Sequence, residues 1–414
     1  MMMTRRVYAL IESRWFLPSI ALFALLLRLC FIFITYKYKT TVFADEIDYM
    51  NIGISLAHGK GFIKDGIHYT AYRPPAQPVM IAVFFRTIGQ SILLIKVAEA
   101  LLLTTLPFIC FRIGRLLGFG IMAANIGAAL ATLHPALAYA SSTLYPTVLT
   151  AVALTLGAWL FGLAADDKDR FGVAIGAGLA FGVAGSATTT FAPLAAIAGL
   201  LLLLRRSYRS ALIVGVVGTL PIVLWMARND RVMGRFTVAT NGGYNLYLGA
   251  NDLATPMSGN WVDPHLYDDN ALGELAVDDG YKTAATEWIK EHPARWSELA
   301  IVRSVIVFDS VGNPRTQGLH SGLAGHLMGW IMLPVVLFGV LGLVVYYKQP
   351  LSWITFAALF LIIASSAATI AKPRFRFPCD PLLAEFSVAG FLYVKGKRGN
   401  RESIASPEPL TTRQ

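Results

Sequence analysis

Apolar residues along the chain gather in long runs that are separated by short polar stretches. Ten of these runs are long enough to cross a bilayer, because a transmembrane helix needs about 20 predominantly apolar residues. The pattern predicts an all-α polytopic membrane protein with about ten transmembrane helices. The predicted spans lie at about 16–36, 91–112, 119–138, 146–164, 171–187, 189–204, 210–227, 323–347, 351–371 and 380–395.

A further apolar run, from Pro74 to Ile88, has about 15 residues, opens with two prolines and contains Arg86. Its length suits an interfacial or re-entrant helix better than a span. If this run does not cross, nearly every short basic loop lies on one side of the membrane, as the positive-inside rule requires. We therefore predict ten spans with both chain ends in the cytoplasm.

This topology places two long segments on the outer side, at about 37–90 and 228–322. Apolar residues from Tyr281 to Phe308 recur at helical spacing, which predicts an amphipathic helix on the outer membrane surface. Residues 1–395 then form a single membrane domain. The polar residues 396–414 are expected to be a disordered cytoplasmic tail.

Composition narrows the class of protein. The chain is 55% hydrophobic and 14% charged, whereas soluble domains are about 25% charged, which excludes a soluble enzyme and a disordered chain. The net charge of +10 is mostly explained by basic cytoplasmic loops, so no nucleic-acid partner is expected. Three cysteines are too few for a disulfide framework. No Cys/His spacing indicates a metal site, and no cofactor is required, although a divalent cation stays open.

The first polar cluster, Asp45, Glu46 and Asp48, lies just beyond the outer end of the first span. On a helix, Asp45 and Glu46 point about 100° apart, and Asp48 returns to the face of Asp45. A carboxylate at the water–lipid boundary can act as a general base for a hydroxyl nucleophile. The alternative is that these acids cap a helix N-terminus and favour its dipole.

Two other outer segments carry cations. Arg73 precedes two prolines that can begin a helix, where it would either hold a phosphate or pair with the acidic cluster. In the segment Lys372–Pro378, Arg374 and Arg376 alternate, so in an extended conformation they would point the same way. Cations on the outer side are an exception to the positive-inside rule, and contact with a lipid phosphate would explain them. That phosphate could belong either to a substrate or to ordinary phospholipid headgroups.

Charged side chains inside the predicted spans are costly unless they are paired or face a cavity. Arg28 is one of these. Lys96 and Glu99 are three residues apart near the outer end of the second span and can pair with each other. His134 near the outer end of the third span is more often a satisfied core residue than a ligand.

Several motifs together resemble a known superfamily. They are the Asp45-Glu46 pair followed by Tyr49, then "HGKGF", "YRPPAQP", "RNDRVMGRFTVATNGGYNLYLGAN" and "KPRFRFPCDP". This order is similar to the GT-C superfamily of integral-membrane glycosyltransferases, close to bacterial protein O-mannosyltransferases and aminoarabinose transferases. The resemblance covers about residues 16–395, and its most specific parts are the Asp-Glu and Arg-Pro-Pro elements.

The resemblance implies transfer of a sugar from a polyprenyl-phosphate donor to a glycan, lipid or protein acceptor. In such a protein Asp45 would be the catalytic base, Glu46 would support it, and the reaction would invert the anomeric carbon. Substrate binding would fall to other polar residues of the outer segments. These candidates are Asp48, Tyr49, Arg73, Lys96, Tyr145, Arg374 and Arg376.

This sequence departs from the superfamily in its second outer loop, where many relatives carry an acid. Residues 142–147 contain none, so either Tyr145 or a residue of the long loop, such as Asp252, takes that place, or the acceptor differs. Two other classes stay open: a transporter or flippase, and an oligosaccharide polymerase or ligase. A transporter would place its charges near the bilayer midplane. The expected location is the bacterial inner membrane, with membrane lipids around the spans and the active site on the periplasmic face.

Overall fold

The computed structural model describes residues 2–38, 44–167, 170–256, 273–309 and 323–398. Within these residues the regular structure is helical, apart from one isolated bridge between Ile63 and Tyr69. In the described part of the chain, six helices are long and apolar enough to cross a membrane, and four shorter helices are also apolar. All ten predicted spans coincide with these helices. The chain is therefore an all-α, multi-pass membrane protein, as predicted.

The spans are built from continuous helices in some places and from two shorter helices in others. The second span, for example, contains two helices joined by the 3₁₀ turn Leu103–Thr105. The helices are α2 (Phe16–Tyr38), α5 (Ile92–Leu102), α6 (Leu106–Leu116), α7 (Ile121–Thr132), α8 (Pro135–Ala140), α9 (Thr147–Asp166), α10 (Phe171–Ala187), α11 (Leu194–Leu204), α12 (Tyr208–Met233), α17 (Leu323–Val345), α18 (Pro350–Ala368) and α19 (Asp380–Arg398).

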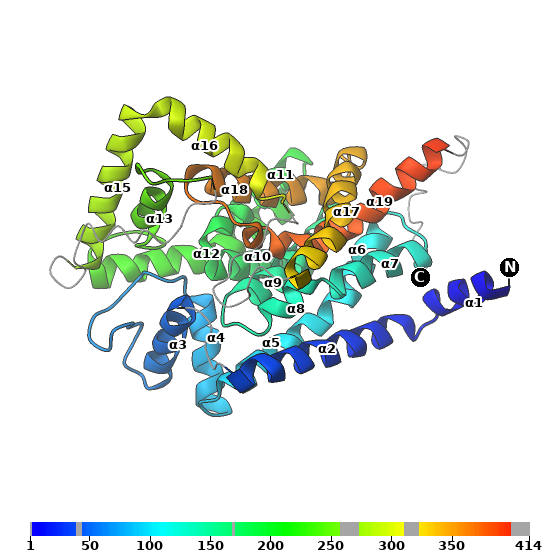
Figure 1. Cartoon of the computed structure of the whole chain (residues 1–414), viewed down its shortest axis with the longest axis horizontal. Coiled ribbons are helices and arrows are strands. Elements are labelled where there is room, and N and C mark those ends of the chain that lie inside the picture. Colours follow the sequence, from blue (N-terminus) through cyan, green and yellow to red (C-terminus); the bar gives the residue numbers. More distant parts are fainter. Residues whose placement is uncertain (1, 39–43, 168–169, 257–272, 310–322, 399–414) are drawn as a thin grey trace.

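The remaining helices lie outside the spans: α1 (Met2–Ile11), α3 (Ala44–Ala57), α4 (Ala76–Thr87), α13 (Gly242–Gly249), α15 (Glu274–Glu291) and α16 (Pro293–Ile306). Figure 1 shows α3, α4, α13 and α15 gathered at one end of the molecule, with α1 and the last turns of α19 at the opposite end. The short α4 packs against α3 and has only 12 residues. This arrangement agrees with the prediction that the 74–88 run does not cross.

Small residues allow the spanning helices to approach closely, as is common in membrane bundles. The clearest case is the contact between α17 and α19. A Cβ atom added at Gly342 would lie 1.8 Å from the carbonyl oxygen of Phe386, and one at Gly390 would lie 2.1 Å from that of Phe338. Only glycine fits at these two positions without moving the backbones apart.

Arg28 is the charged residue closest to the middle of the first span, and it is 1% exposed. Its guanidinium donates to the carbonyl oxygen of Thr132 at a distance of 2.6 Å, where α7 ends. A helix C-terminus carries unpaired carbonyls and a partial negative charge, so it offers a suitable partner for a buried cation. Arg28 therefore joins α2 to α7.

Two predicted boundaries differ from the structure. The predicted amphipathic helix between Tyr281 and Phe308 is two helices, because α15 ends at Glu291 and Pro293 begins α16. Proline lacks the N–H that a continuous helix would need at this position. Helix α19 continues to Arg398, three residues into the predicted tail, and residues 399–414 lie outside the described residues.

Candidate functional site

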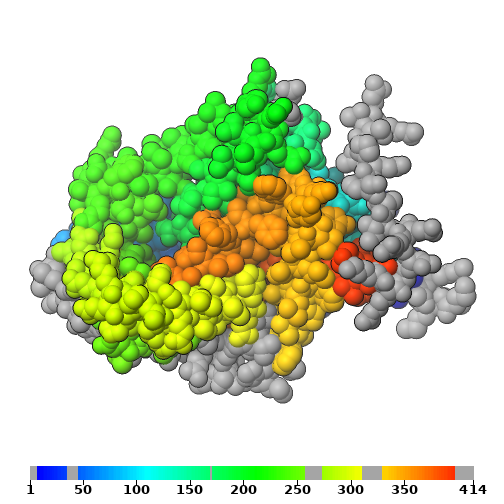
Figure 2. All heavy atoms as spheres, turned by 90° about the horizontal axis from the view of Figure 1, so that it is seen from above, coloured from blue at the N-terminus to red at the C-terminus, as the bar shows by residue number. Residues whose placement is uncertain are grey.

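A cavity of about 1220 Å³ lies where the ends of several spans meet α3, α13 and the segment before α19. Figure 2 shows a hollow between the yellow-green α15 and α16, the green segments that precede them, and the orange α18. Apolar side chains of α2, α17 and the α7–α8 junction line one part of the cavity, and charged or hydroxyl side chains line another. The apolar part includes Leu27, Phe31, Leu133 and Met332.

The acidic cluster lies at the start of α3 and contacts Arg73. The Arg73 guanidinium donates to Asp45 Oδ1 at 2.6 Å and, through two nitrogens, to Asp48 Oδ2 at 3.0 and 2.8 Å. Asp45 and Asp48 therefore share one helix face, as predicted from their spacing. Of the two roles considered for Arg73, the structure shows the pairing with the acidic cluster.

Asp45 also accepts a hydrogen bond from the hydroxyl of Tyr145, with 2.9 Å between the hydroxyl and Oδ2. Burial acts to raise the pKa of Asp45, but the charges of Arg73 and Arg374 outweigh it and hold the pKa below its usual value. The hydrogen bonds from Tyr145 and Arg73 act in the same direction. Asp45 is therefore a carboxylate at neutral pH, and its side chain remains 36% exposed.

Tyr49 and Tyr145 form an aromatic pair beside the carboxylate. Their ring centroids are 6.5 Å apart in an edge-on arrangement, and the Arg73 guanidinium lies 5.4 Å from the Tyr49 ring. Burial raises the pKa of Tyr49 to about 12. Both tyrosines line the cavity, and Tyr49 is a neutral phenol at physiological pH.

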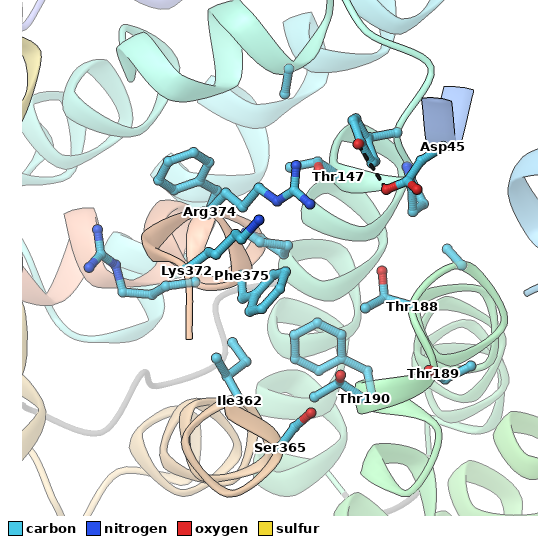
Figure 3. Close-up of a pocket in the computed structure, with 18 of the residues that line it drawn as sticks. Asp45, Thr147, Thr188, Thr189, Thr190, Ile362, Ser365, Lys372, Arg374 and Phe375 are labelled. Atoms are coloured by element: carbon cyan, nitrogen blue, oxygen red, sulfur yellow. Dashed lines mark hydrogen bonds between the residues drawn. The ribbon is translucent and has the colours of Figure 1, made fainter. Parts of the chain in front are cut away.

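Lys372 and Arg374 form a cationic wall on the side of the cavity that faces Asp45 (Figure 3). The Arg374 guanidinium lies 4.9 Å from the centre of the Tyr145 ring. Burial and the nearby charge of Arg374 lower the pKa of Lys372 to about 8, although Asp45 opposes this effect. Cations thus approach Asp45 from one side while Arg73 binds it from another.

The prediction that Arg374 and Arg376 point the same way is wrong. Their segment is not extended but consists of two 3₁₀ turns, Pro373–Phe375 and Phe377–Cys379. A 3₁₀ turn has three residues per turn, so positions two apart diverge. Arg374 lies over Tyr145, whereas Arg376 takes another direction.

Arg376 also lines the cavity, but its side chain is 1% exposed and belongs to a buried ion pair rather than to the cationic wall. Its Nε donates to Asp380 Oδ1 at 2.7 Å, and another nitrogen donates to the Val307 carbonyl at 2.7 Å. His134 Nε2 lies 2.9 Å from Asp380 Oδ2, while His134 Nδ1 accepts from the Ala136 amide. His134 thus contacts Asp380 and also lines the cavity, and the Arg376–Asp380 pair holds the turns that carry Arg374.

Glu46 points away from Asp45 into a separate buried cluster. One of its oxygens accepts from the Leu144 amide at 3.2 Å, and Lys96 lies within electrostatic reach of both Glu46 and Glu99. Glu99 accepts from the Gln77 side chain at 2.8 Å. The predicted pairing of Lys96 with Glu99 alone is therefore too simple.

The buried cluster around Glu46, Gln77 and Glu99 holds the backbone of Leu144 in place. Lys96 is fully buried and is not among the residues lining the cavity, which argues against its predicted contact with a phosphate. Gln77 also donates to the Leu144 carbonyl at 3.2 Å. The cluster thus holds Leu144 from both its amide and its carbonyl, next to Tyr145.

Of the two substitutes considered for the missing second-loop acid, the structure favours Tyr145. It contacts Asp45 directly and lines the cavity. Asp252 instead accepts from the indole N–H of Trp288 at 2.8 Å, outside the cavity lining. Among the residues that the structure describes, no group of three or more His, Cys, Asp or Glu side chains is placed to hold a metal ion.

Sequence reasoning missed a row of hydroxyl groups in the cavity. Thr147 begins α9, Thr188 and Thr190 lie between α10 and α11, and Ser365 lies in α18. A usable signal was present, because three consecutive threonines (188–190) interrupt an apolar stretch at the outer side. Serine and threonine hydroxyls in spans usually donate to a carbonyl of their own helix. Their presence in an apolar run therefore did not by itself predict a binding site.

No protein-family model matches the sequence, and a search of curated proteins finds no match. Among solved structures, the chain is similar to ArnT from Cupriavidus metallidurans in the apo state, with 16% identity, coverage of 84% of this chain and 73% of ArnT, and a TM-score of 0.39. It is also similar to the same ArnT bound to undecaprenyl phosphate, with 15% identity, coverage of 92% and 78%, and a TM-score of 0.42.

Proposed function

We propose that this protein transfers a sugar from a polyprenyl-phosphate donor to an acceptor hydroxyl. The observation that carries the proposal is that one cavity brings together a carboxylate, Asp45, and a cationic wall, Lys372 and Arg374, beside an apolar part. Each of these three features matches one part of the reaction. The sequence segments that supply them are far apart and meet only in the fold.

Asp45 is suited to act as the base. It is a carboxylate at neutral pH and is partly open to the cavity. During the reaction a bond forms between the acceptor oxygen and the anomeric carbon of the sugar, while the bond from that carbon to the phosphate oxygen breaks. The acceptor proton passes to Asp45, whose low pKa is sufficient because the hydroxyl becomes strongly acidic in the transition state. Direct displacement inverts the anomeric carbon.

The cationic wall suits the leaving group. When the bond to the sugar breaks, the polyprenyl phosphate gains a negative charge that Arg374 and Lys372 face across the cavity. Fixed positive groups near a developing negative charge stabilise the transition state strongly in a site with little water. Phosphate is already a good leaving group, so the reaction needs no acid to protonate it.

The apolar part of the cavity suits the hydrocarbon chain of the donor. Leu27 and Phe31 of α2, together with Leu133 and Met332, line the cavity, and α2 is otherwise largely exposed where lipid would surround it. A polyprenyl chain can therefore remain in an apolar environment while its phosphate reaches Arg374. The acceptor is a glycan, a lipid such as lipid A, or a protein of the cell envelope.

We place the site on the periplasmic side of a bacterial inner membrane, with both chain ends in the cytoplasm. The support is the charge distribution of the loops together with the position of α1 and the end of α19 opposite the outer helices. A sugar transferase on this side would act on lipid-linked sugars that have already crossed the membrane. Its products would be parts of the cell envelope.

The test is a comparison of envelope glycans from cells that carry the wild-type protein, Asp45→Asn or no protein. Mass analysis should show a sugar modification that is absent without the protein and absent with Asp45→Asn, because removal of a general base typically costs about 10² to 10⁴ in rate. Asp167→Asn is the control, since Asp167 pairs with Arg170 in an exposed loop away from the cavity. An Asp45→Asn protein that is inserted normally and gives the full modification would overturn the assignment.

A further inference from the structure

The hydroxyl row in the cavity leads to a statement about the donor sugar that rests on the proposed function. We infer that Thr147, Thr190 and Ser365 bind the sugar, and that this sugar is neutral and rich in hydroxyl groups, without an amino group. In Figure 3, Thr190 and Ser365 lie below Asp45 and the cationic wall. A sugar attached to a phosphate at Arg374 would lie against the row.

These three hydroxyls have no hydrogen-bond partner within the described part of the protein, although they line the cavity. Thr188, between them, does have one, because its hydroxyl lies 2.8 Å from that of Thr150. Buried or half-buried polar groups are normally paired, so hydroxyls that face a cavity without partners indicate a polar ligand. In Figure 3, Ser365 and Thr190 lie close to each other at one end of the row, and Thr147 lies between Asp45 and Arg374.

Hydroxyl groups match the hydrogen-bonding capacity of a neutral sugar. Each threonine or serine hydroxyl donates one hydrogen bond and accepts others, and each sugar hydroxyl does the same. The two therefore satisfy each other without charge. A cavity of about 1220 Å³ exceeds the usual range for small-molecule sites, about 300 to 1,000 Å³, so it has room for a sugar beside part of the lipid chain that carries it.

The charges around the row oppose an amino sugar. Lys372 and Arg374 face it, and a protonated amino group would be repelled by both. The carboxylates among the described lining residues are Asp45 and Asp309. Asp45 is already bound by Arg73 and Tyr145, and Asp309 follows Val307 on the side where Arg376 is held. A buried charge without a partner is costly, so an ammonium group at the row is disfavoured.

The test measures the binding of four lipids to the purified full-length protein in detergent. They are undecaprenyl phosphate alone and undecaprenyl phosphate carrying glucose, an amino-arabinose or a glucuronic acid. The variants are wild type, Thr190→Val with Ser365→Ala, and the control Thr219→Val. Thr219 is a matched control because its hydroxyl bonds the Gly215 carbonyl of its own helix, outside the cavity lining.

We expect the glucose-bearing lipid to bind wild type and Thr219→Val at least tenfold more tightly than the bare phosphate. The double variant should bind this lipid about tenfold more weakly than wild type, which corresponds to about one modest hydrogen bond at each position. Its affinity for the bare phosphate should not change. Unchanged binding of the bare phosphate also shows that the double variant is folded.

Three outcomes would overturn the inference while leaving the proposed function intact. These are preferred binding of the amino sugar, preferred binding of the uronic acid, and no gain from glucose over the bare phosphate. A fourth outcome, failure of every lipid including the bare phosphate to bind wild type, overturns the proposed function itself and this inference with it.

Discussion

The hydrogen bond from Tyr145 to Asp45 gives a prediction that separates the role of a hydroxyl from that of a ring. Tyr145→Phe removes the donor that lies 2.9 Å from Asp45 Oδ2 but keeps the ring that Arg374 covers at 4.9 Å. The hydrogen bond lowers the pKa of Asp45, so its loss raises that pKa. The proposed base works as a carboxylate, and the variant should therefore lose activity at a higher pH than wild type as the pH falls.

The size of the shift follows from the contact. A hydrogen bond to a charged group contributes about 1.5 to 3 kcal/mol net. Asp45 is 36% exposed and keeps Arg73, so solvent screening favours the low end of this range. About 1.4 kcal/mol corresponds to about one pKa unit. We expect the acid limb of kcat/KM to move up by about one pH unit, with a smaller change in rate above it.

The assay is sugar transfer in proteoliposomes from about pH 2.5 to 8, a range that begins below the usual pKa of an aspartate, with Tyr208→Phe as the control. Tyr208 is an exposed tyrosine at the start of α12, away from the cavity. A Tyr145→Phe protein whose rate falls equally at every pH, with the acid limb unmoved, would refute the reasoning. In that case the hydroxyl would matter for the position of Asp45 and not for its charge.

Two further predictions concern the cationic wall and its support. Lys372, with a pKa of about 8, loses its charge as the pH rises through that value, so donor KM should increase several-fold between about pH 7 and 9. Lys372→Arg should abolish the increase because arginine stays charged over this range. A wild-type KM that does not change with pH would contradict this prediction. Asp380→Asn leaves Arg376, which is 1% exposed, without its counter-charge. The substitution should lower the free energy of unfolding by about 3 to 5 kcal/mol. The check is thermal unfolding of the purified protein in detergent, and an unchanged melting temperature would exclude a stabilising role for the Arg376–Asp380 pair.

The spans could be predicted from the sequence because the signal is local. A run of apolar residues either reaches the length of a bilayer or does not, and its neighbours along the chain contain all the information. The same holds for Asp45 and Asp48, whose spacing places both on one helix face. Both bind Arg73 in the structure.

Which side chains meet across the fold could not be predicted in the same way. Lys96 and Glu99 are close in sequence, but Gln77 and Glu46 approach them from other helices and change their partners. Arg376 lines the cavity, but it was expected to point the same way as Arg374 because alternation suggests an extended segment. Asp380, four residues later, is its partner, and this spacing is a helical signal that alternation concealed.

The contact of Arg73 with Asp45 and Asp48 has a consequence for how the protein is made. Chains enter the membrane from the N-terminus, so the acidic cluster reaches the outer surface long before Lys372 and Arg374 are synthesised. During that interval Arg73, from the same segment, can already bind both carboxylates, and its single positive charge offsets one of their two negative charges. The acidic half of the site is therefore partly neutralised on its own, and the half proposed to receive phosphate is added only when the last helix pair is inserted.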